Sequence, residues 1–345
     1  MPEVSPVPLA ELTTLRLGGA ARRLVEATSE AELVDVVRGC DSGGEPLLVL
    51  GGGSNLVVSD EGFDGTVVAV RTRGTRAGAP TCGGTAVTVA AGEPWDELVG
   101  EMVNSELVGM EALSGIPGST GAVPIQNVGA YGQDVAQTIA SVRTWDRQAQ
   151  AQRTFANADC GFGYRSSRFK ANPEQFVVLD VTFDLLPGRL SAPVTYAELA
   201  RRLDVGLGER APLADVRATV LQLRRAKGMV LDADDYDTWS AGSFFTNPVL
   251  AAHEAARLPT KAPRWVQPDG SVKTSAAWLI EAAGFGKGYS RGQVALSGKH
   301  PLALTNRGDG TTKELLELAR EVRDAVQERF AVRLVNEPVT VGCAL

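Results

Sequence analysis

Apolar residues recur along this chain with two different spacings, and together they predict a protein of mixed strands and helices. Short apolar or alternating runs are typical of strands and lie at residues 46–50, 66–70, 86–91, 141–146, 153–155 and 176–185. Apolar residues spaced three and four apart predict helices instead, as in Leu33, Val36, Val37 and Cys40. The same spacing predicts helices over residues 95–103, 215–228 and 275–283, and near the C-terminus.

Helix start and stop signals support these boundaries. Ser29 with Glu32, and Thr311 with Glu314, have the spacing of capping boxes. Asp215 is predicted to cap its helix. Glycine pairs or single glycines at 43–44 and 284 predict helix ends. The first helix and the strands around it therefore form a small α/β unit.

The segment that departs most clearly from these helix and strand patterns is residues 115–132, GIPGSTGAVPIQNVGAYG, here called the cradle loop. Its glycines permit positive φ angles and close approach of a ligand, while Pro117 and Pro124 restrict the backbone. The composition argues against a regular helix or an inner strand. It predicts a stiff loop suited to an anion such as a diphosphate. An ordinary surface loop is the alternative, but Ile116, Val123, Ile125, Val128 and Tyr131 indicate a loop anchored in a core.

A second glycine-rich segment, residues 51–55 with the sequence GGGSN, is here called the glycine turn. It stands between apolar runs at residues 46–50 and 56–58, so the pattern predicts strand, turn and strand. A dinucleotide-binding GxGxxG segment would open a helix, and a P-loop would carry a lysine after its glycines. The glycine turn has neither property.

Taken together, GGGSNLVV and the cradle loop resemble the UDP-N-acetylenolpyruvoylglucosamine reductases of peptidoglycan synthesis, which are FAD enzymes of the vanillyl-alcohol-oxidase/PCMH superfamily. The resemblance implies an α+β fold: an FAD-binding domain of PCMH type with two subdomains, plus a C-terminal α+β substrate domain. It places the FAD domain at residues 1–190, with subdomains of about 1–72 and 73–190. A connecting segment at 191–213 and the substrate domain at 214–345 follow, and the resemblance leaves open whether the last strand returns to the FAD domain.

The resemblance also implies that the two glycine-rich segments hold the FAD diphosphate and ribityl chain. Neither segment contains His or Cys, so we expect FAD to be bound without a covalent link. NADPH and substrate would use one site in turn, which removes the need for a separate dinucleotide fingerprint. The implied cofactor residues are Gly51, Gly52, Gly53, Ser54, Asn55, Leu56, Gly115, Ile116, Gly118, Ser119, Gly121, Ala122, Asn127, Gly129, Ala130 and Arg224.

Three residues carry the catalytic roles that the resemblance implies. In GFGYRSSRFK, Tyr164-Arg165 matches the family's catalytic arginine, although the stretch alone also fits a basic surface loop. In SAGSFFTNP, Ser243 matches the proton donor, although alone it fits a loop cap; Thr246 stands where the family commonly has Lys. In LVNEPVTVG, Glu337 is an acid in an apolar run that we expect to be a strand, and such an acid is costly to bury unless paired. The family's arginine two residues later is replaced by Val339.

The substrate contacts that the resemblance implies are spread along the chain. Tyr196 in TYAEL matches a family branch in which a Tyr-bearing segment folds over the substrate, although simple packing is the alternative. Lys227, with Arg224, matches an Arg-x-x-Lys helix end, where cations also suit the helix dipole. The acidic stretch LDADDYD at residues 231–237 departs from the family pattern that usually follows. The complete implied set is Tyr196, Lys227, Asn247, His300, Gln126 and Tyr131, with a surface histidine as the alternative for His300.

The implied reaction is the FAD-dependent, NADPH-driven reduction of UDP-N-acetylglucosamine enolpyruvate to UDP-N-acetylmuramate. Charge that builds on the enolpyruvyl carboxylate would be stabilised by Arg165, because a guanidinium presents a planar fork to a carboxylate. A protonated Glu337, favoured by burial, would hydrogen-bond the same group, and Ser243 would donate the proton. A related FAD-dependent oxidase and a non-catalytic UDP-sugar-binding protein remain alternatives.

Composition and charge argue against several other classes of protein. A net charge of −7 and a pI near 5.1 argue against nucleic-acid or anionic membrane partners for these 345 residues. Two histidines are too few for a histidine-rich metal site, so no metal is expected. Cys40, Cys82, Cys160 and Cys343 lack metal-like spacing and are expected to be buried free thiols in a reducing cytoplasm. The chain shows no secretory signal and no run of membrane-spanning length, and we expect a monomer.

Overall fold

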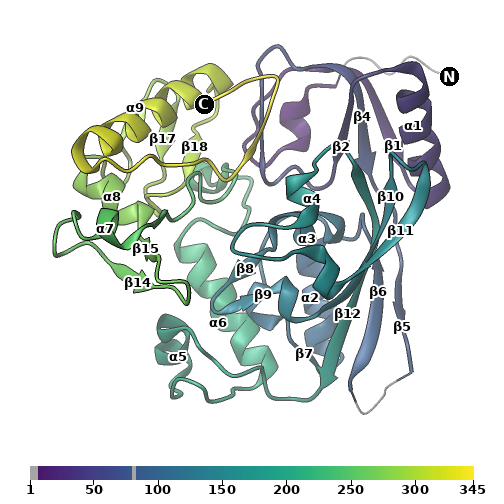
Figure 1. The fold of residues 1–345 in the computed structure, drawn as a ribbon, viewed down its shortest axis with the longest axis horizontal. Coiled ribbons are helices and arrows are strands. Elements are labelled where there is room, and N and C mark those ends of the chain that lie inside the picture. Colours follow the sequence, from purple (N-terminus) through teal and green to yellow (C-terminus); the bar gives the residue numbers. More distant parts are fainter. Residues whose placement is uncertain (1–6, 80–82) are drawn as a thin grey trace. The chain divides into compact units, whose positions relative to one another are not determined.

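The computed structural model describes residues 7–79 and 83–345, and its chain divides into two compact units (Figure 1). The first, here called the middle unit, comprises Arg22–Gly52 and Asp64–Ala226. The second, here called the terminal unit, comprises residues 7–21 with Gly53–Phe63 and Lys227–Leu345. The division falls within the glycine turn, between Gly52 and Gly53.

Two sheets form the framework of the middle unit. β2 (Leu47–Leu50) pairs in parallel with β4 (Phe63–Val70), with Leu47 opposite Thr66, and the glycine turn follows directly at the carboxyl end of β2. The smaller sheet has the order β1–β4–β2, with β1 (Ala21–Ala27), β4 (Phe63–Val70) and β2 (Leu47–Leu50). The larger is antiparallel, with the order β11–β10–β12–β6–β5, and β7 also pairs with β12. Its strands are β11 (Ala151–Ala156), β10 (Ile139–Asp146), β12 (Phe176–Pro187), β6 (Thr85–Ala90), β5 (Thr75–Ala77) and β7 (Leu107–Val108).

One continuous apolar core joins these sheets to two helices, α1 (Glu30–Gly43) and α2 (Trp95–Asn104). Trp95 is fully buried at the start of α2, and its ring lies 5.9 Å from that of Phe183 on β12. A smaller apolar cluster joins α5 (Ala197–Leu203) to α6 (Leu213–Ala226). The remaining short elements of the unit are α3 (Val123–Gln126), α4 (Arg168–Ala171), β8 (Gly129–Ala130) and β9 (Gln133–Asp134).

The terminal unit has its own core around α8 (Ala276–Ala282) and α9 (Thr312–Phe330). Leu15, Leu17 and Val57 join this core, which explains why the chain's first residues belong to the unit that also contains its end. In Figure 1, the yellow helix α9 lies beside β17 (Val294–Leu296) and β18 (Leu304–Asn306). The unit's other elements are β3 (Leu56–Val58), β13 (Val249–Leu250), α7 (Ala252–Ala255), β14 (Arg264–Val266), β15 (Val272–Thr274), β16 (Ser290–Arg291), β17 (Val294–Leu296), β18 (Leu304–Asn306) and β19 (Val339–Val341).

Both predicted capping boxes are confirmed, at the first turns of α1 and α9. Four predictions were wrong in detail. Helix α6 begins at Leu213, so Asp215 lies inside its first turn and is no cap. The cradle loop contains one helical turn, α3, because Pro124 at a helix start loses no intrahelical bond. Glu337, which we expected within a strand, precedes β19 and is half-buried. Cys343, which we expected to be buried, is only half-buried. Cys82 lies outside the described residues.

In the described part of the chain, no helix has both the length and the apolar character needed to cross a membrane.

Candidate active site

The glycine turn and the cradle loop meet in the middle unit. A Cβ atom on Gly51 would lie 2.4 Å from Ser119 Oγ, and one on Gly52 would lie 2.6 Å from Gly118 Cα. Real Cβ contacts are not this short, so a side chain at Gly52 would clash with the backbone of the cradle loop, and one at Gly51 would force the Ser119 side chain to move. The two glycine-rich segments are therefore in direct contact, and their joint role in holding FAD stays a prediction.

The backbone of the glycine turn is suited to an anion. Among the residues that the structure describes, the N–H groups of residues 52–55 donate to no protein acceptor. A positive charge stands next to the turn, since Arg71 Nη1 donates to the Gly51 carbonyl at 3.2 Å. Clustered backbone donors with a nearby cation are the chemistry that a diphosphate requires. The residues present therefore fit the FAD diphosphate.

The cradle loop is anchored on both sides. Trp95 N donates to the Gly118 carbonyl at 3.0 Å, and Gly121 N donates to the Ala91 carbonyl at 2.8 Å. Gly115 N donates to Asp96 Oδ1 at 2.6 Å, and the same carboxylate pairs with Arg217. Burial opposes ionisation of Asp96, but Arg217 and the Gly115 N–H together lower its pKa. The loop is thus held rigidly, as a ligand cradle must be.

Arg165 is bound directly to the cradle loop. Its Nη2 donates to the Gly129 carbonyl at 2.7 Å, and its Nη1 donates to the Asn127 carbonyl at 3.4 Å. Ser167 Oγ donates to the Ile125 carbonyl at 2.8 Å, which ties the next turn to the same loop. The Arg165 backbone has a φ of +51°, an unusual left-handed conformation. Such strain is kept where neighbouring contacts impose it. The guanidinium itself is oriented by its two hydrogen bonds to the cradle-loop carbonyls.

Two predicted substrate residues also lie at the cradle loop. Gln126 is buried and accepts a hydrogen bond from Lys170 Nζ at 2.8 Å through its Oε1. The rings of Tyr131 and Tyr196 meet edge to face with centroids 5.3 Å apart. A Cβ on Gly132 would lie 2.2 Å from Thr195 Oγ1, so the Tyr196 segment packs closely against the loop. The structure therefore brings Gln126, Tyr131, Arg165 and Tyr196 into one region of the middle unit.

Arg224 lies in the last turn of α6, as the sequence predicts. Burial lowers the pKa of its guanidinium to about 10, while Tyr131 and Asp96 act in the opposite direction. The side chain is therefore cationic at neutral pH and faces the same region of the middle unit as Tyr131.

The terminal unit brings together a second group of predicted residues. Ser243 Oγ lies 3.4 Å from His300 Nε2. The segment that carries Ser243 runs between two others, because Phe244 N donates to the Leu302 carbonyl at 2.7 Å and Glu337 N donates to the Phe244 carbonyl at 2.8 Å. Ser243, His300 and Glu337 are thus on adjacent segments.

Asn247 and Asn55 are held by backbone contacts of the terminal unit. Asn247 Oδ1 accepts from Ala276 N, at the start of α8, at 3.0 Å. The Asn55 carbonyl accepts from Val339 N at 2.9 Å, and β19 pairs in parallel with β3 so that Val339 is opposite Leu56. Val339 is 45% exposed, so this position, where the family arginine is missing, lies on the surface of the strand. Lys227 is the first residue of the last segment of the terminal unit and follows α6 directly.

Sequence reasoning missed Glu111, which is only 1% exposed and binds three donors. Its carboxylate accepts from Gly109 N and Ala192 N, both at 2.7 Å, and from Gln133 Nε2 at 3.0 Å. This residue ties the start of the Tyr196 segment to the residues that follow the cradle loop. The available signal was an acid between apolar residues in GMEAL, the same signal that singled out Glu337.

A glycine cradle beside an antiparallel sheet, with an arginine bound to it, fits the class of FAD-dependent oxidoreductases of the PCMH type. Family models agree, since residues 21–154 match an FAD binding domain and residues 234–341 match the C-terminal domain of UDP-N-acetylenolpyruvoylglucosamine reductase. The chain belongs to the UDP-N-acetylenolpyruvoylglucosamine reductase family. It is a UDP-N-acetylmuramate dehydrogenase that uses FAD and NADPH in peptidoglycan precursor synthesis.

Individual relatives support this membership over almost the whole chain. The UDP-N-acetylenolpyruvoylglucosamine reductase of Cutibacterium acnes is 56% identical, and the match covers 98% of this chain and 90% of that protein. The enzyme of the same name from Streptomyces coelicolor is 54% identical, covering 99% and 91%. The crystal structure of the Thermus caldophilus enzyme superimposes with a TM-score of 0.64 at 26% identity, covering 98% of this chain and 99% of that one.

Proposed function

We propose that Arg165, Ser243 and Glu337 carry out the reduction, with each acting on a different part of the enolpyruvyl group. The hydride for the terminal carbon of the enol ether would come from bound FAD after its reduction by NADPH. Arg165 would receive the substrate carboxylate and stabilise the negative charge that builds on it, which is commonly the largest catalytic contribution. The observation that supports this role most directly is the fixed guanidinium on the cradle loop, held by the carbonyls of Gly129 and Asn127.

Ser243 would donate the proton to the other carbon, and Glu337 would hydrogen-bond the carboxylate. Support for Ser243 comes from its 3.4 Å contact with His300, which orients the hydroxyl. Support for Glu337 comes from its backbone bond to Phe244, the residue next to Ser243. General acids act only from a defined position, and these contacts supply one.

The proposed diphosphate contacts are Lys227, Asn247 and His300, with Gln126 and Tyr131 as further substrate contacts. The role of Asn247 is supported by the hydrogen bond that its amide oxygen accepts from Ala276 N. With the oxygen used in this way, the NH2 group is oriented to donate to an anion. The proposed cofactor contacts are those of the glycine turn and the cradle loop, with Arg224.

We also propose the domain limits 1–190, 191–213 and 214–345, and the two family matches, 21–154 and 234–341, fall inside the first and last of these. A monomeric enzyme in the cytoplasm fits this reaction, since NADPH and nucleotide sugars are supplied there. Light scattering of the purified protein would test whether it is a monomer, and cell fractionation would test whether it is cytoplasmic.

The overall proposal predicts that the purified protein is yellow and that acid precipitation releases all of its flavin, because neither glycine-rich segment can form a covalent link. Under anaerobic conditions, NADPH oxidation beyond the one equivalent that reduces the bound flavin should depend on addition of the enolpyruvyl nucleotide sugar. Oxygen-dependent turnover without that substrate would instead support an oxidase. A colourless protein would support a simple nucleotide-sugar binder.

Tyr196 belongs to the family branch with a substrate-covering segment in this proposal. Its ring packs on Tyr131, yet its side chain is 40% exposed, so its hydroxyl is free to meet a ligand. Tyr196→Phe keeps the ring contact and removes one hydrogen bond of about 1.4 kcal/mol, so KM for the nucleotide sugar should rise about tenfold with little change in kcat.

The matched control for this variant is Tyr289→Phe, which removes a hydroxyl that donates to Glu321 on α9. Steady-state kinetics should find its KM unchanged. An unchanged KM in Tyr196→Phe, or an effect confined to flavin reduction by NADPH, would argue against the covering role.

A further inference from the structure

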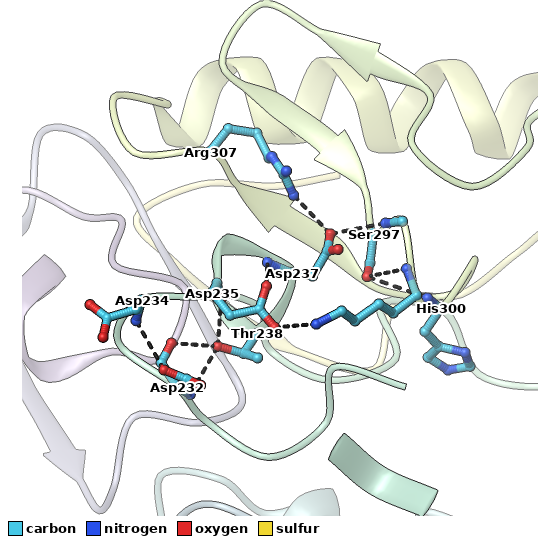
Figure 2. A network of polar contacts seen from close by, with 10 residues as sticks. Asp232, Asp234, Asp235, Asp237, Thr238, Ser297, His300 and Arg307 are labelled. Atoms are coloured by element: carbon cyan, nitrogen blue, oxygen red, sulfur yellow. Dashed lines mark hydrogen bonds and ion pairs between the residues drawn. The ribbon is translucent and has the colours of Figure 1, made fainter. Parts of the chain in front are cut away.

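The acidic stretch that departs from the family pattern forms an ordered turn. We call residues 232–238 the acidic link; it lies in the terminal unit, and Figure 2 shows its contacts. Thr238 Oγ1 accepts from Asp232 N at 3.0 Å and lies 2.8 Å from the carbonyls of Asp232 and Asp235. Asp234 contributes its backbone N–H, which donates to Asp232 Oδ1 at 3.0 Å. Hydrogen bonds between its own residues therefore hold the acidic link in one conformation, although four of its residues are aspartates.

Two carboxylates of the acidic link extend beyond it and hold residues 297–300, here called the histidine loop. Asp237 Oδ1 accepts from Gly298 N at 2.9 Å and from Arg307 Nη1 at 2.8 Å. Asp235 forms an ion pair with Lys299. The Asp237 side chain is only 15% exposed, so solvent screens its contacts less than those of an ordinary surface pair.

The histidine loop is also stiffened from within. Ser297 is fully buried, and its Oγ accepts from Lys299 N at 3.0 Å and from His300 N at 3.3 Å. A Cβ on Gly298 would lie 3.2 Å from Asp237 Oδ2, so the loop backbone lies directly against the carboxylate. A displacement of Asp237 would therefore be transmitted to His300.

His300 is the residue through which the histidine loop meets the proposed chemistry, since its Nε2 lies 3.4 Å from Ser243 Oγ. The two residues come from separate segments, which a backbone hydrogen bond from Phe244 N to the Leu302 carbonyl also connects. The orientation of the Ser243 hydroxyl thus depends on where the histidine loop is held.

We propose that Asp237, with Asp235, is a positioning residue that holds the His300 imidazole against Ser243 and thereby orients the hydroxyl for proton donation. This inference rests on the proposed role of Ser243. Asp237 touches neither Ser243 nor His300 directly; it acts through Gly298. Small misplacements of a catalytic group carry large rate penalties, so a device of this kind affects the proton-transfer half of the reaction selectively.

The test uses full-length protein with bound FAD and compares three variants. Asp237→Ala removes both contacts of the carboxylate. Asp237→Asn keeps an oxygen for the Gly298 N–H and loses the charge opposite Arg307. Asp234→Asn is the matched control, because it changes the same charge in the same link at an exposed side chain. Stopped-flow absorbance then follows flavin reduction by NADPH and reoxidation by the enolpyruvyl nucleotide sugar separately.

Asp237→Ala should slow reoxidation by roughly tenfold and leave flavin reduction unchanged, because only reoxidation requires an oriented proton donor. Asp237→Asn should recover most of that loss, and Asp234→Asn should match the unmodified enzyme. Equal slowing of both half-reactions by Asp237→Ala would identify a general structural defect and overturn the proposal. No slowing in either half would overturn it as well.

A second readout does not depend on catalysis. The chain has two histidines, His253 and His300, so the imidazole NMR spectrum contains two sets of signals that His253→Gln assigns. Asp237→Ala should shift the His300 signals and leave those of His253 in place. If Ser243→Ala proves to have normal reoxidation, the proposed function of Ser243 fails, while the His300 signals still report whether Asp237 holds the loop. Unmoved His300 signals in Asp237→Ala would overturn the positioning role itself.

Discussion

Ser243→Ala is expected to keep rapid bleaching of the flavin by NADPH and to lose its reoxidation by the enolpyruvyl nucleotide sugar. Flavin reduction needs no proton from Ser243, whereas the second half-reaction needs one at the carbon that does not receive the hydride. General acid catalysis contributes about 10²–10⁴-fold, so reoxidation should fall by at least about a hundredfold. Stopped-flow absorbance of each half-reaction, on protein shown to contain FAD, is the measurement.

Two companion variants sharpen this result. Ser243→Cys should recover part of the lost rate, because a thiol can also donate a proton. Thr246→Ala removes a hydroxyl from the same motif, one that contacts the Val335 carbonyl at 3.3 Å, and should leave both halves intact. If Ser243→Ala slows both halves equally, the residue positions flavin. If it slows neither, the proton must come from Glu337 or water.

Arg165→Ala is expected to remove reduction of the enolpyruvyl group while FAD remains bound. Loss of one electrostatic stabiliser of a developing charge typically costs about 10²–10³-fold in turnover, and we expect at least that here. FAD occupancy should change little, because the cradle loop is also anchored through Trp95, Asp96 and Ala91. The measurements are single-turnover reoxidation and the flavin-to-protein absorbance ratio.

Arg168→Ala is the matched control for this prediction. Arg168 belongs to the same basic segment, but its Nε donates to the Asp159 carbonyl at 2.6 Å and its side chain is exposed. Arg165→Lys should fall between the two, since an ammonium keeps the charge and loses the planar fork. Near-normal reoxidation in Arg165→Ala would remove this residue from the mechanism.

Local features were predictable wherever the chemistry is local. A capping box involves residues three apart, so both boxes were read correctly from the sequence. Helix α6 was placed about two residues late, because Asp215 resembles a cap and no local signal distinguishes a cap from a first-turn acid. The one-turn helix inside the cradle loop was missed for a different reason, because the high glycine and proline content of the loop outweighed Pro124 as a helix-start signal.

Long-range partners could not be predicted in this way. An acid in an apolar run singled out Glu337, yet the fully buried acid with three donors is Glu111, and those donors come from residues 109, 133 and 192. The sequence of the acidic stretch at 231–237 does not indicate which cations pair with it, because Lys299 and Arg307 are more than sixty residues away along the chain.

The sequence by itself determined the family and the cofactor, and it supplied the residues proposed for the site. Motifs such as the glycine turn, the cradle loop and SAGSFFTNP are contiguous, and their chemistry depends on neighbouring residues. Only the tertiary structure decided that Gly51 and Gly52 pack on Gly118 and Ser119, that Arg165 is fixed by cradle carbonyls, and that Asp237 holds the loop of His300. These contacts join segments far apart in the chain, and their partners are selected by packing and hydrogen bonding in three dimensions, which no local pattern records.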